Sequence, residues 1–213
     1  MIIAIDGPAA AGKGTLARRL AEHLELAYLD TGLLYRAVGF QLLDEGADPE
    51  NAAAAEKAAK SLDPGHFDNP SLRTDAVANA ASKVSAIPAV REALLAFQRT
   101  FAAHPPTGKN GVVLDGRDIG TVVCPEADAK LFVTASVEVR AERRLKELQE
   151  RGEEAIHGRV LQDMKERDAR DSGRDVSPLV PADDAFVLDT SHLDAEAAFA
   201  AALKYIQQQT RSG

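Results

Sequence analysis

The sequence predicts an α/β fold in which a five-stranded parallel sheet is flanked by helices. Short apolar segments alternate with longer segments of helical periodicity along most of the 213 residues, and this alternation is typical of a buried parallel sheet. A glycine-rich turn joins the first apolar segment to the first helical one. Between about residues 48 and 104 the pattern is helical with no clear strand, which indicates an insert in the core.

The expected strands are short apolar runs that end in turn signals, the first of them ending at Asp6-Gly7. They cover residues 2–6, 27–30, 112–115, 130–134 and 185–189. The first helix has a leucine stripe at Leu16, Leu20 and Leu24, with charged residues off it. We expect helices at 15–24, 31–45, 49–62, 74–85, 89–103, 137–151, 159–171 and 195–208.

These elements predict a core of residues 1–47 and 105–213, with a mainly helical insert at 48–104. A short lid within the core is expected at 149–159, where Gly152 and Gly158 serve as hinges and Arg151 and Arg159 are candidate lid residues. A plain connection between two helices is the alternative for this segment. The turn-rich stretch 63–70 is a further candidate hinge.

Composition excludes several classes of protein. Apolar residues make up 45% and charged residues 27%, as in ordinary globular chains, and 25 Lys and Arg against 33 Asp and Glu give a net charge of −8. This balance argues against nucleic acid as a partner. The single cysteine, Cys124, has no second cysteine to pair with, the N-terminus does not resemble a signal peptide, and no apolar run approaches roughly 18 residues. We therefore expect a cytoplasmic monomer with no membrane partner.

The strongest motif is the segment from Gly7 to Thr15, which has the Gly-x4-Gly-Lys spacing of a P-loop between a strand and a helix. Glycines let backbone N–H groups approach phosphate oxygens, and the helix N-terminus and Lys13 add positive charge. The predicted ATP-binding residues are Gly7, Pro8, Ala9, Ala10, Ala11, Gly12, Lys13, Gly14 and Thr15. Because Gly14 directly follows Lys13, the hydroxyl that usually contacts magnesium is shifted to Thr15, which favours nucleotide kinases over GTPases.

A kinase must also hold an acceptor phosphate, and arginines suit this task because a guanidinium grips two oxygens. Arg36 lies in the second expected helix, where a solvated residue is the alternative. Arg117 follows the strand that ends at Asp115, at the sheet edge where α/β proteins bind ligands. Asp115 is a candidate magnesium ligand with Thr15, or else a turn cap. The five histidines show no metal-ligand spacing.

Further motifs narrow the interpretation. They are Leu29-Asp30-Thr31-Gly32, Tyr35-Arg36, Asn79-Ala80-Ala81-Ser82, Val90-Arg91, Asp115-Gly116-Arg117-Asp118-Ile119-Gly120-Thr121, Lys165-Glu166-Arg167-Asp168, Arg170-Asp171 and Pro178-Leu179-Val180-Pro181. Together with the P-loop they resemble the bacterial cytidylate kinases, P-loop nucleoside monophosphate kinases, over nearly the whole chain. The resemblance implies that the insert at 48–104 binds the acceptor nucleotide. The family's insert usually carries a small β-meander, for which residues 67–74 are too few here.

The resemblance implies transfer of the γ-phosphoryl group of Mg·ATP to CMP and dCMP, in pyrimidine nucleotide metabolism. It implies catalytic roles for Lys13, Arg117 and Arg167, and CMP binding by Thr31, Arg36, Ser82, Arg91, Arg117, Asp118, Arg167, Asp171 and Arg174. Asp118, Arg91 and Ser82 would read the base, since a carboxylate accepts from the cytosine amine and repels the carbonyl of uracil. Asp171 would contact the ribose hydroxyls.

Two other functions remain open on the sequence alone. One is a P-loop kinase for another small acceptor such as UMP or AMP. The other is a P-loop GTPase-type switch, which the lack of an Asn-Lys-x-Asp guanine motif and the presence of Gly14 both disfavour.

Overall fold

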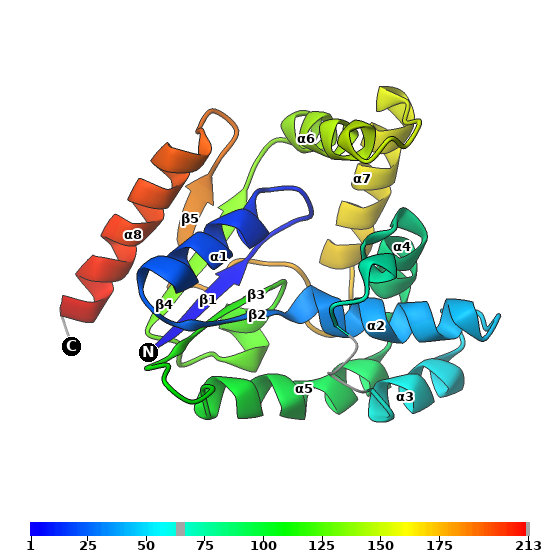
Figure 1. Ribbon diagram of the computed structural model, residues 1–213, viewed down its shortest axis with the longest axis horizontal. Coiled ribbons are helices and arrows are strands. Elements are labelled where there is room, and N and C mark those ends of the chain that lie inside the picture. Colours follow the sequence, from blue (N-terminus) through cyan, green and yellow to red (C-terminus); the bar gives the residue numbers. More distant parts are fainter. Residues whose placement is uncertain (63–66, 212–213) are drawn as a thin grey trace. The chain divides into compact units, whose positions relative to one another are not determined.

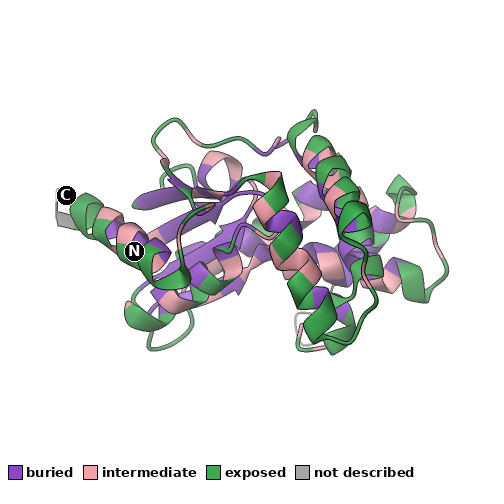
Figure 2. Ribbon diagram, turned by 90° about the horizontal axis from the view of Figure 1, so that it is seen from above, coloured by how far each residue is buried: buried purple, intermediate pink, exposed green. Residues whose placement is uncertain are grey.

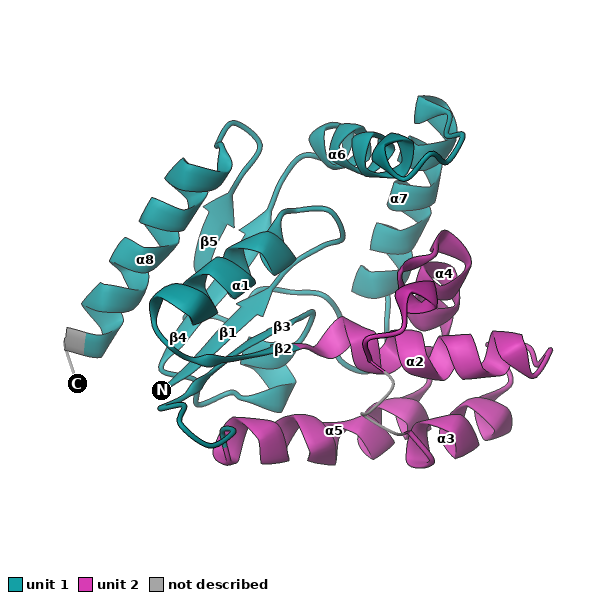
Figure 3. Ribbon diagram, in the orientation of Figure 1, with its two compact units in different colours: residues 1–29, 105–213 teal, residues 30–104 magenta. Residues whose placement is uncertain are grey.

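The computed structural model describes residues 1–62 and 67–211, the side chain of Arg211 excepted, and divides into two compact units (Figure 3). Unit 1 comprises Met1–Leu29 and Pro105–Gly213, and unit 2 comprises Asp30–His104. Unit 2 begins at Asp30 because α2 (Thr31–Asp44) packs against the other helices of this unit, whereas the insert was expected from residue 48.

Unit 1 is built on the predicted five-stranded parallel sheet, in the order β2-β3-β1-β4-β5 (Figure 1). The strands are β1 (Ile2–Asp6), β2 (Ala27–Asp30), β3 (Val112–Gly116), β4 (Ala129–Thr134) and β5 (Phe186–Asp189), each within one residue of the expected bounds. In the register, Asp6 lies beside Gly116 of β3 and Phe132 of β4. The segments that follow β1 and β3 consequently leave the sheet at the same edge.

Two helices of unit 1, α1 (Lys13–His23) and α8 (Ala195–Arg211), lie side by side against the sheet (Figure 1). The leucine stripe predicted for the first helix is buried there: Leu16 and Leu20 pack with Ile3 and Ile5 of β1 and with Ile206 of α8. Figure 2 shows the central strands as largely buried. This core holds the first strand and first helix, and hence the loop between them, in place.

The helices α6 (Val137–Glu150) and α7 (His157–Ser172) form a second, smaller core in unit 1, around Leu148 and Met164. Gly152, with φ of +77°, lies in the connection after α6 as expected. Gly158 lies in the first turn of α7, which begins at His157 and not at about residue 159 as expected. A short π-helical segment, η3 (Ile119–Val123), was not predicted.

Unit 2 is helical, with α2, α3 (Ala52–Lys60), the 3₁₀ turn η2 (Pro70–Arg73), α4 (Asp75–Val84) and α5 (Pro88–Ala103). The helix expected from residue 49 begins at Ala52 instead, because the Asn51 side chain accepts from the backbone N–H of Ala54 and caps the helix. At Gly39 a Cβ atom would lie 2.9 Å from the Cβ of Ala80, so glycine permits the close packing of α2 on α4. Part of the candidate hinge at 63–70, residues 63–66, lies outside the described residues.

Candidate active site

The phosphate-binding loop runs from Gly7 to Gly12 and leads into α1 at Lys13. Gly7 has φ of +145°, and a Cβ there would overlap the carbonyl oxygen of Val133 on β4. Gly12 has φ of +89°. Only glycine adopts these conformations without strain, so the glycine spacing of the motif is explained by the backbone path.

The lysine of the motif is buried beside a carboxylate. Lys13 is 6% exposed, its Nζ donates to the carbonyl of Pro8 at 2.9 Å, and it lies 4.0 Å from Oδ1 of Asp115. Asp115 also accepts from the hydroxyl of Tyr28 at 3.4 Å. A Cβ at Gly14 would lie 3.4 Å from Oδ2 of Asp115, an ordinary van der Waals contact, so the carboxylate lies beside the start of α1.

This arrangement suits a divalent cation held together with a nucleotide. Asp115 offers a carboxylate at the loop, and the hydroxyl of Thr15 lies in the first turn of α1. Hard cations take oxygen ligands and use phosphate oxygens and water to complete their shell. In residues 1–62 and 67–211, no group of three or more His, Cys, Asp or Glu side chains is arranged to hold a metal.

Two further contacts support the phosphate-binding loop. Arg140 of α6 donates to the carbonyl of Ala9 at 3.3 Å, and the hydroxyl of Thr190 donates to the carbonyl of Ala11 at 3.0 Å. Neither residue was predicted. The sequence did contain a signal for Arg140, which lies within an apolar stripe at helical spacing formed by Val137, Ala141, Leu145 and Leu148. An arginine on a buried helix face needs hydrogen-bond partners, so its position indicated a structural role. The sequence carries no comparable signal for Thr190.

A cluster of charged residues brings together four predicted site residues of unit 1. The Asp171 carboxylate accepts from Nε of Arg117 at 3.1 Å and from Nη2 of Arg174 at 2.5 Å. Burial alone would raise the pKa of Asp171, which is 2% exposed, but Arg117, Arg174 and Arg167 together lower it. Arg174 lies beyond the end of α7 at Gly173 and still reaches Asp171.

Asp118 is buried, 5% exposed, at the start of η3. Its carbonyl accepts from the N–H groups of Val122 and Val123 at 2.9 and 3.1 Å. It follows Arg117 in the chain, so the predicted base-reading residue and one predicted phosphate-binding arginine leave the end of β3 together.

Unit 2 holds the other predicted acceptor residues. Ser82 and Arg91 are both buried; Nη1 of Arg91 donates to the carbonyl of Ser85 at 3.0 Å, and the Ser85 hydroxyl donates to the carbonyl of Ser82 at 2.9 Å. The guanidinium of Arg91 lies 5.5 Å from the ring centre of Tyr35. Ser82 and Arg91 thus meet at the turn between α4 and α5.

Two other acceptor candidates belong to α2. Thr31 is the buried first residue of α2, and Arg36 donates to the carbonyl of Leu72 in η2 at 2.9 Å. The candidate lid residues Arg151 and Arg159 are exposed, at the C-terminus of α6 and in the first turn of α7.

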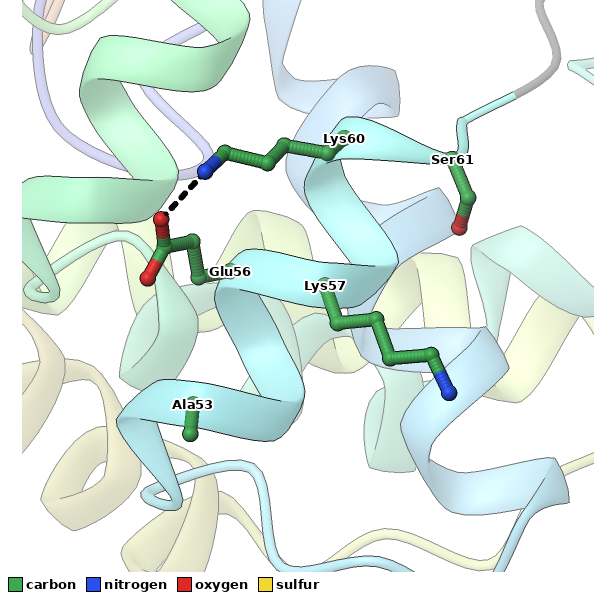
Figure 4. A pocket seen from close by; sticks show the side chains of 5 residues that line it. All are labelled: Ala53, Glu56, Lys57, Lys60 and Ser61. Carbon is green, nitrogen blue, oxygen red and sulfur yellow. Dashed lines mark hydrogen bonds and ion pairs between the residues drawn. The ribbon is translucent and has the colours of Figure 1, made fainter.

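A hollow on α3 is lined by Ala53, Glu56, Lys57, Lys60 and Ser61 (Figure 4). It contains none of the predicted site residues. Its ion pair joins Glu56 and Lys60 of the same helix at 2.5 Å, with side chains that are 39% and 65% exposed. Such solvent-accessible pairs contribute little to stability or binding.

A family model described as cytidylate kinase matches residues 3–208. The chain belongs to the cytidylate kinase family. A cytidylate kinase of Paramagnetospirillum magneticum is 69% identical over 205 residues, covering 96% of this chain and 97% of the relative. A cytidylate kinase of Rhodospirillum rubrum is 62% identical over 211 residues, covering 99% of each chain.

Among solved structures, a gluconokinase from Sinorhizobium meliloti 1021 has a TM-score of 0.50 and 15% identity, covering 99% of this chain and 96% of that chain. This likeness shows the fold alone. It agrees with the P-loop kinase architecture predicted from the alternating strands and helices. In the described part of the chain, every helix is too short or too polar to span a lipid bilayer.

Proposed function

We propose that the protein transfers the γ-phosphoryl group of ATP to CMP, giving CDP and ADP. The observation that carries this proposal is the glycine-rich loop with buried Lys13 beside Asp115, in a cytidylate kinase family chain. ATP and CMP are the substrates, and the enzyme is a phosphotransferase with a phosphate group as acceptor. The alternatives, transfer to UMP or AMP and a GTPase-type switch, are not favoured.

In the proposed mechanism the phosphate of CMP attacks the γ-phosphorus of ATP, in line with the departing ADP oxygen. That phosphate is already an oxyanion, so the chain supplies no strong base. Backbone N–H groups of residues 7 and 9–15 hold the triphosphate, and Lys13, Arg117 and Arg167 stabilise the negative charge that moves during transfer. The burial of Lys13 supports this role, because a charge is more effective where water is excluded.

We propose that CMP is held by the residues that the family resemblance assigns to it. Asp118, Arg91 and Ser82 would read cytosine, and Asp171 the ribose; the remaining proposed contacts are Thr31, Arg36, Arg117, Arg167 and Arg174. The burial of Asp118, Arg91 and Ser82 supports base reading, because a polar group withdrawn from water discriminates strongly between matched and mismatched partners.

Kinases of this family use ATP with a divalent metal ion. We propose that the ion is Mg²⁺, which favours a site with few protein ligands and several waters. Asp115 and Thr15 are the residues that would contact it or its water shell. The ion neutralises phosphate charge when bound, and Tyr28 holds the Asp115 carboxylate in position.

The proposal extends to dCMP as a second acceptor, to a role in pyrimidine nucleotide metabolism and to a cytoplasmic monomer. It also keeps residues 149–159 as a short lid.

The test is a coupled assay that measures ADP formed from ATP with CMP, dCMP, UMP or AMP. We expect the highest kcat/KM with CMP, and sedimentation at about the mass of one chain. A higher kcat/KM with UMP or AMP would overturn the acceptor assignment.

A further inference from the structure

The carboxylate of Asp6 joins the last residue of β1 to the segment that follows Asp118. Its Oδ1 accepts from the N–H of Ile119 at 2.8 Å, and its Oδ2 accepts from the N–H of Gly120 at 2.7 Å. Asp6 is 5% exposed. Because these two N–H groups come directly after Asp118 in the chain, Asp6 fixes the backbone from which the Asp118 side chain projects.

The same segment is held from a second side. A Cβ at Gly120 would lie 3.4 Å from Oδ2 of Asp6 and 3.2 Å from Cδ of Lys130. Lys130 is itself anchored, since its Nζ binds Asp184 at 2.8 Å. Gly120 is therefore packed between Asp6 and a lysine that has little freedom to move.

Aspartate is the one small side chain that accepts from both N–H groups at once. Asparagine has one carbonyl oxygen, and its NH₂ group would face the second N–H donor. Burial raises the pKa of Asp6 to about 7, although the bonds from Gly120 and Ile119 lower it; Asp118 raises it and Lys13 lowers it. Burying a carboxyl group away from water costs free energy. The structural contribution of the Asp6 carboxyl is its pair of hydrogen bonds to the η3 backbone.

We propose that Asp6 is a positioning residue for recognition of the acceptor base. It lies at the end of β1, the strand that also leads into the phosphate-binding loop, and from there it sets the orientation of Asp118. This inference rests on the proposed base-reading role of Asp118. Gly7 follows Asp6 directly, so a single strand end determines the start of the ATP-binding loop and the position of the base-reading carboxylate, both within unit 1.

The test is steady-state kinetics of Asp6→Asn with CMP and UMP at saturating ATP. We expect the KM for CMP to rise by about fivefold and the CMP:UMP ratio of kcat/KM to fall by a similar factor, as for loss of one buried hydrogen bond. The KM for ATP should stay within about twofold, since the loop itself is unchanged. Circular dichroism and binding of a fluorescent ATP analogue confirm that the variant is folded.

The matched control is Asp128→Asn. Asp128 accepts from the N–H of Ile2 at 2.6 Å, so it makes the same kind of bond at the opposite end of β1, and its loss should leave both acceptor constants unchanged. If Asp6→Asn does not fold, Gly120→Ala displaces the same segment without altering Asp6. It should lower the CMP:UMP ratio in the same direction.

Asp118→Ala and the double variant Asp6→Asn/Asp118→Ala separate the two proposals. If both are right, Asp118→Ala lowers the ratio and adding Asp6→Asn lowers it no further. If Asp118→Ala lowers the ratio while Asp6→Asn and Gly120→Ala leave it at the wild-type value, Asp6 has no positioning role. If Asp118→Ala leaves the ratio unchanged, base reading by Asp118 is wrong and the role of Asp6 falls with it.

Discussion

Arg140 binds both oxygens of the Asp168 carboxylate, and this pair joins α6 to α7. Nη1 of Arg140 lies 3.0 Å from Oδ1 of Asp168 and Nη2 lies 2.5 Å from Oδ2. The same guanidinium donates to the carbonyls of Ala135 and Ala9. One side chain thus connects the phosphate-binding loop to the helix that carries Arg167 and Asp171.

We predict that Arg140→Met destabilises the fold by on the order of 3 kcal/mol, because it removes the Arg140 partner of the Asp168 carboxylate and of the Ala135 and Ala9 carbonyls. It should also raise the KM for ATP, since the loop loses a support. Urea unfolding and ATP kinetics measure the two effects. The control is Lys146→Met on the same helix, where the pair with Glu150 is 78% and 66% exposed; there the change should stay within about 0.5 kcal/mol. Equal effects of the two variants would contradict the assigned role of Arg140.

Lys13→Ala should nearly abolish phosphoryl transfer while the fold remains intact. Loss of a preorganised charge at the migrating group costs on the order of 3 kcal/mol or more in the transition state, a reduction of kcat by about 100-fold. Steady-state kinetics and circular dichroism check this, with Lys109→Ala, an exposed lysine of the same unit, as the control. Near-normal kcat in a folded Lys13→Ala protein would reject the assignment of the loop.

Arg36→Ala should weaken CMP and UMP alike and leave their ratio nearly unchanged, because a phosphate contact does not distinguish bases. Asp118→Ala should instead reduce the CMP:UMP ratio of kcat/KM by about tenfold or more, since it removes both the attraction for the cytosine amine and the repulsion of the uracil carbonyl. Steady-state kinetics of both variants with CMP and with UMP measure these ratios. The reverse pattern would mean that the base and phosphate contacts are exchanged.

Asp6 makes stability depend on pH in a defined direction. Burial raises its pKa from near 3.8 to about 7, so between about pH 4 and 7 the folded state binds a proton that the unfolded state releases. The stability contributed by Asp6 is complete below about pH 4 and is lost as the pH rises through 7. In Asp6→Asn this loss is absent, and the melting-temperature difference between the two proteins should change by on the order of 5 °C across that range. A difference that is constant from pH 4 to 8 would contradict the raised pKa.

The segment from Gln149 to Arg159 should gain protection from hydrogen exchange when a bisubstrate analogue binds. It contains the connection between α6 and α7, with exposed Arg151 and Arg159 and the positive φ of Gly152. Closure of a lid excludes water and orders the backbone. The buried strand β1 serves as the internal reference. Unchanged exchange in 149–159 at saturation would reject the lid.

The sequence predicted the strands and most helices closely, because each of these elements has one dominant local signal. Apolar runs mark β1 and β3, and the leucine stripe marks α1. The start of α3 was missed since Pro49 and Asn51 are both acceptable at a helix N-terminus, and only the side-chain bond of Asn51 to Ala54 decides between them. The boundary of unit 2 depends on the tertiary packing of α2, which periodicity does not report.

The candidate site was predictable where a motif carries it and not where its support comes from distant residues. Lys13 and Asp115 follow from the loop and the strand end. The bonds of Asp6 to Ile119 and Gly120 span more than 110 residues, and nothing local to Asp6 indicates them. Helical periodicity does not explain Arg174 either, since it lies outside α7 and is placed by its bond to Asp171.

The pairing of Asp171 with two arginines bears on which sugar the enzyme accepts. Both oxygens of this carboxylate already have a partner, Arg117 on one and Arg174 on the other. If the 2′-hydroxyl of CMP adds a bond there, its absence in dCMP leaves no buried acceptor unsatisfied, and the usual penalty for a missing hydroxyl does not arise. We therefore expect weak selection against the deoxyribose form, in which case one enzyme would serve the precursors of both RNA and DNA.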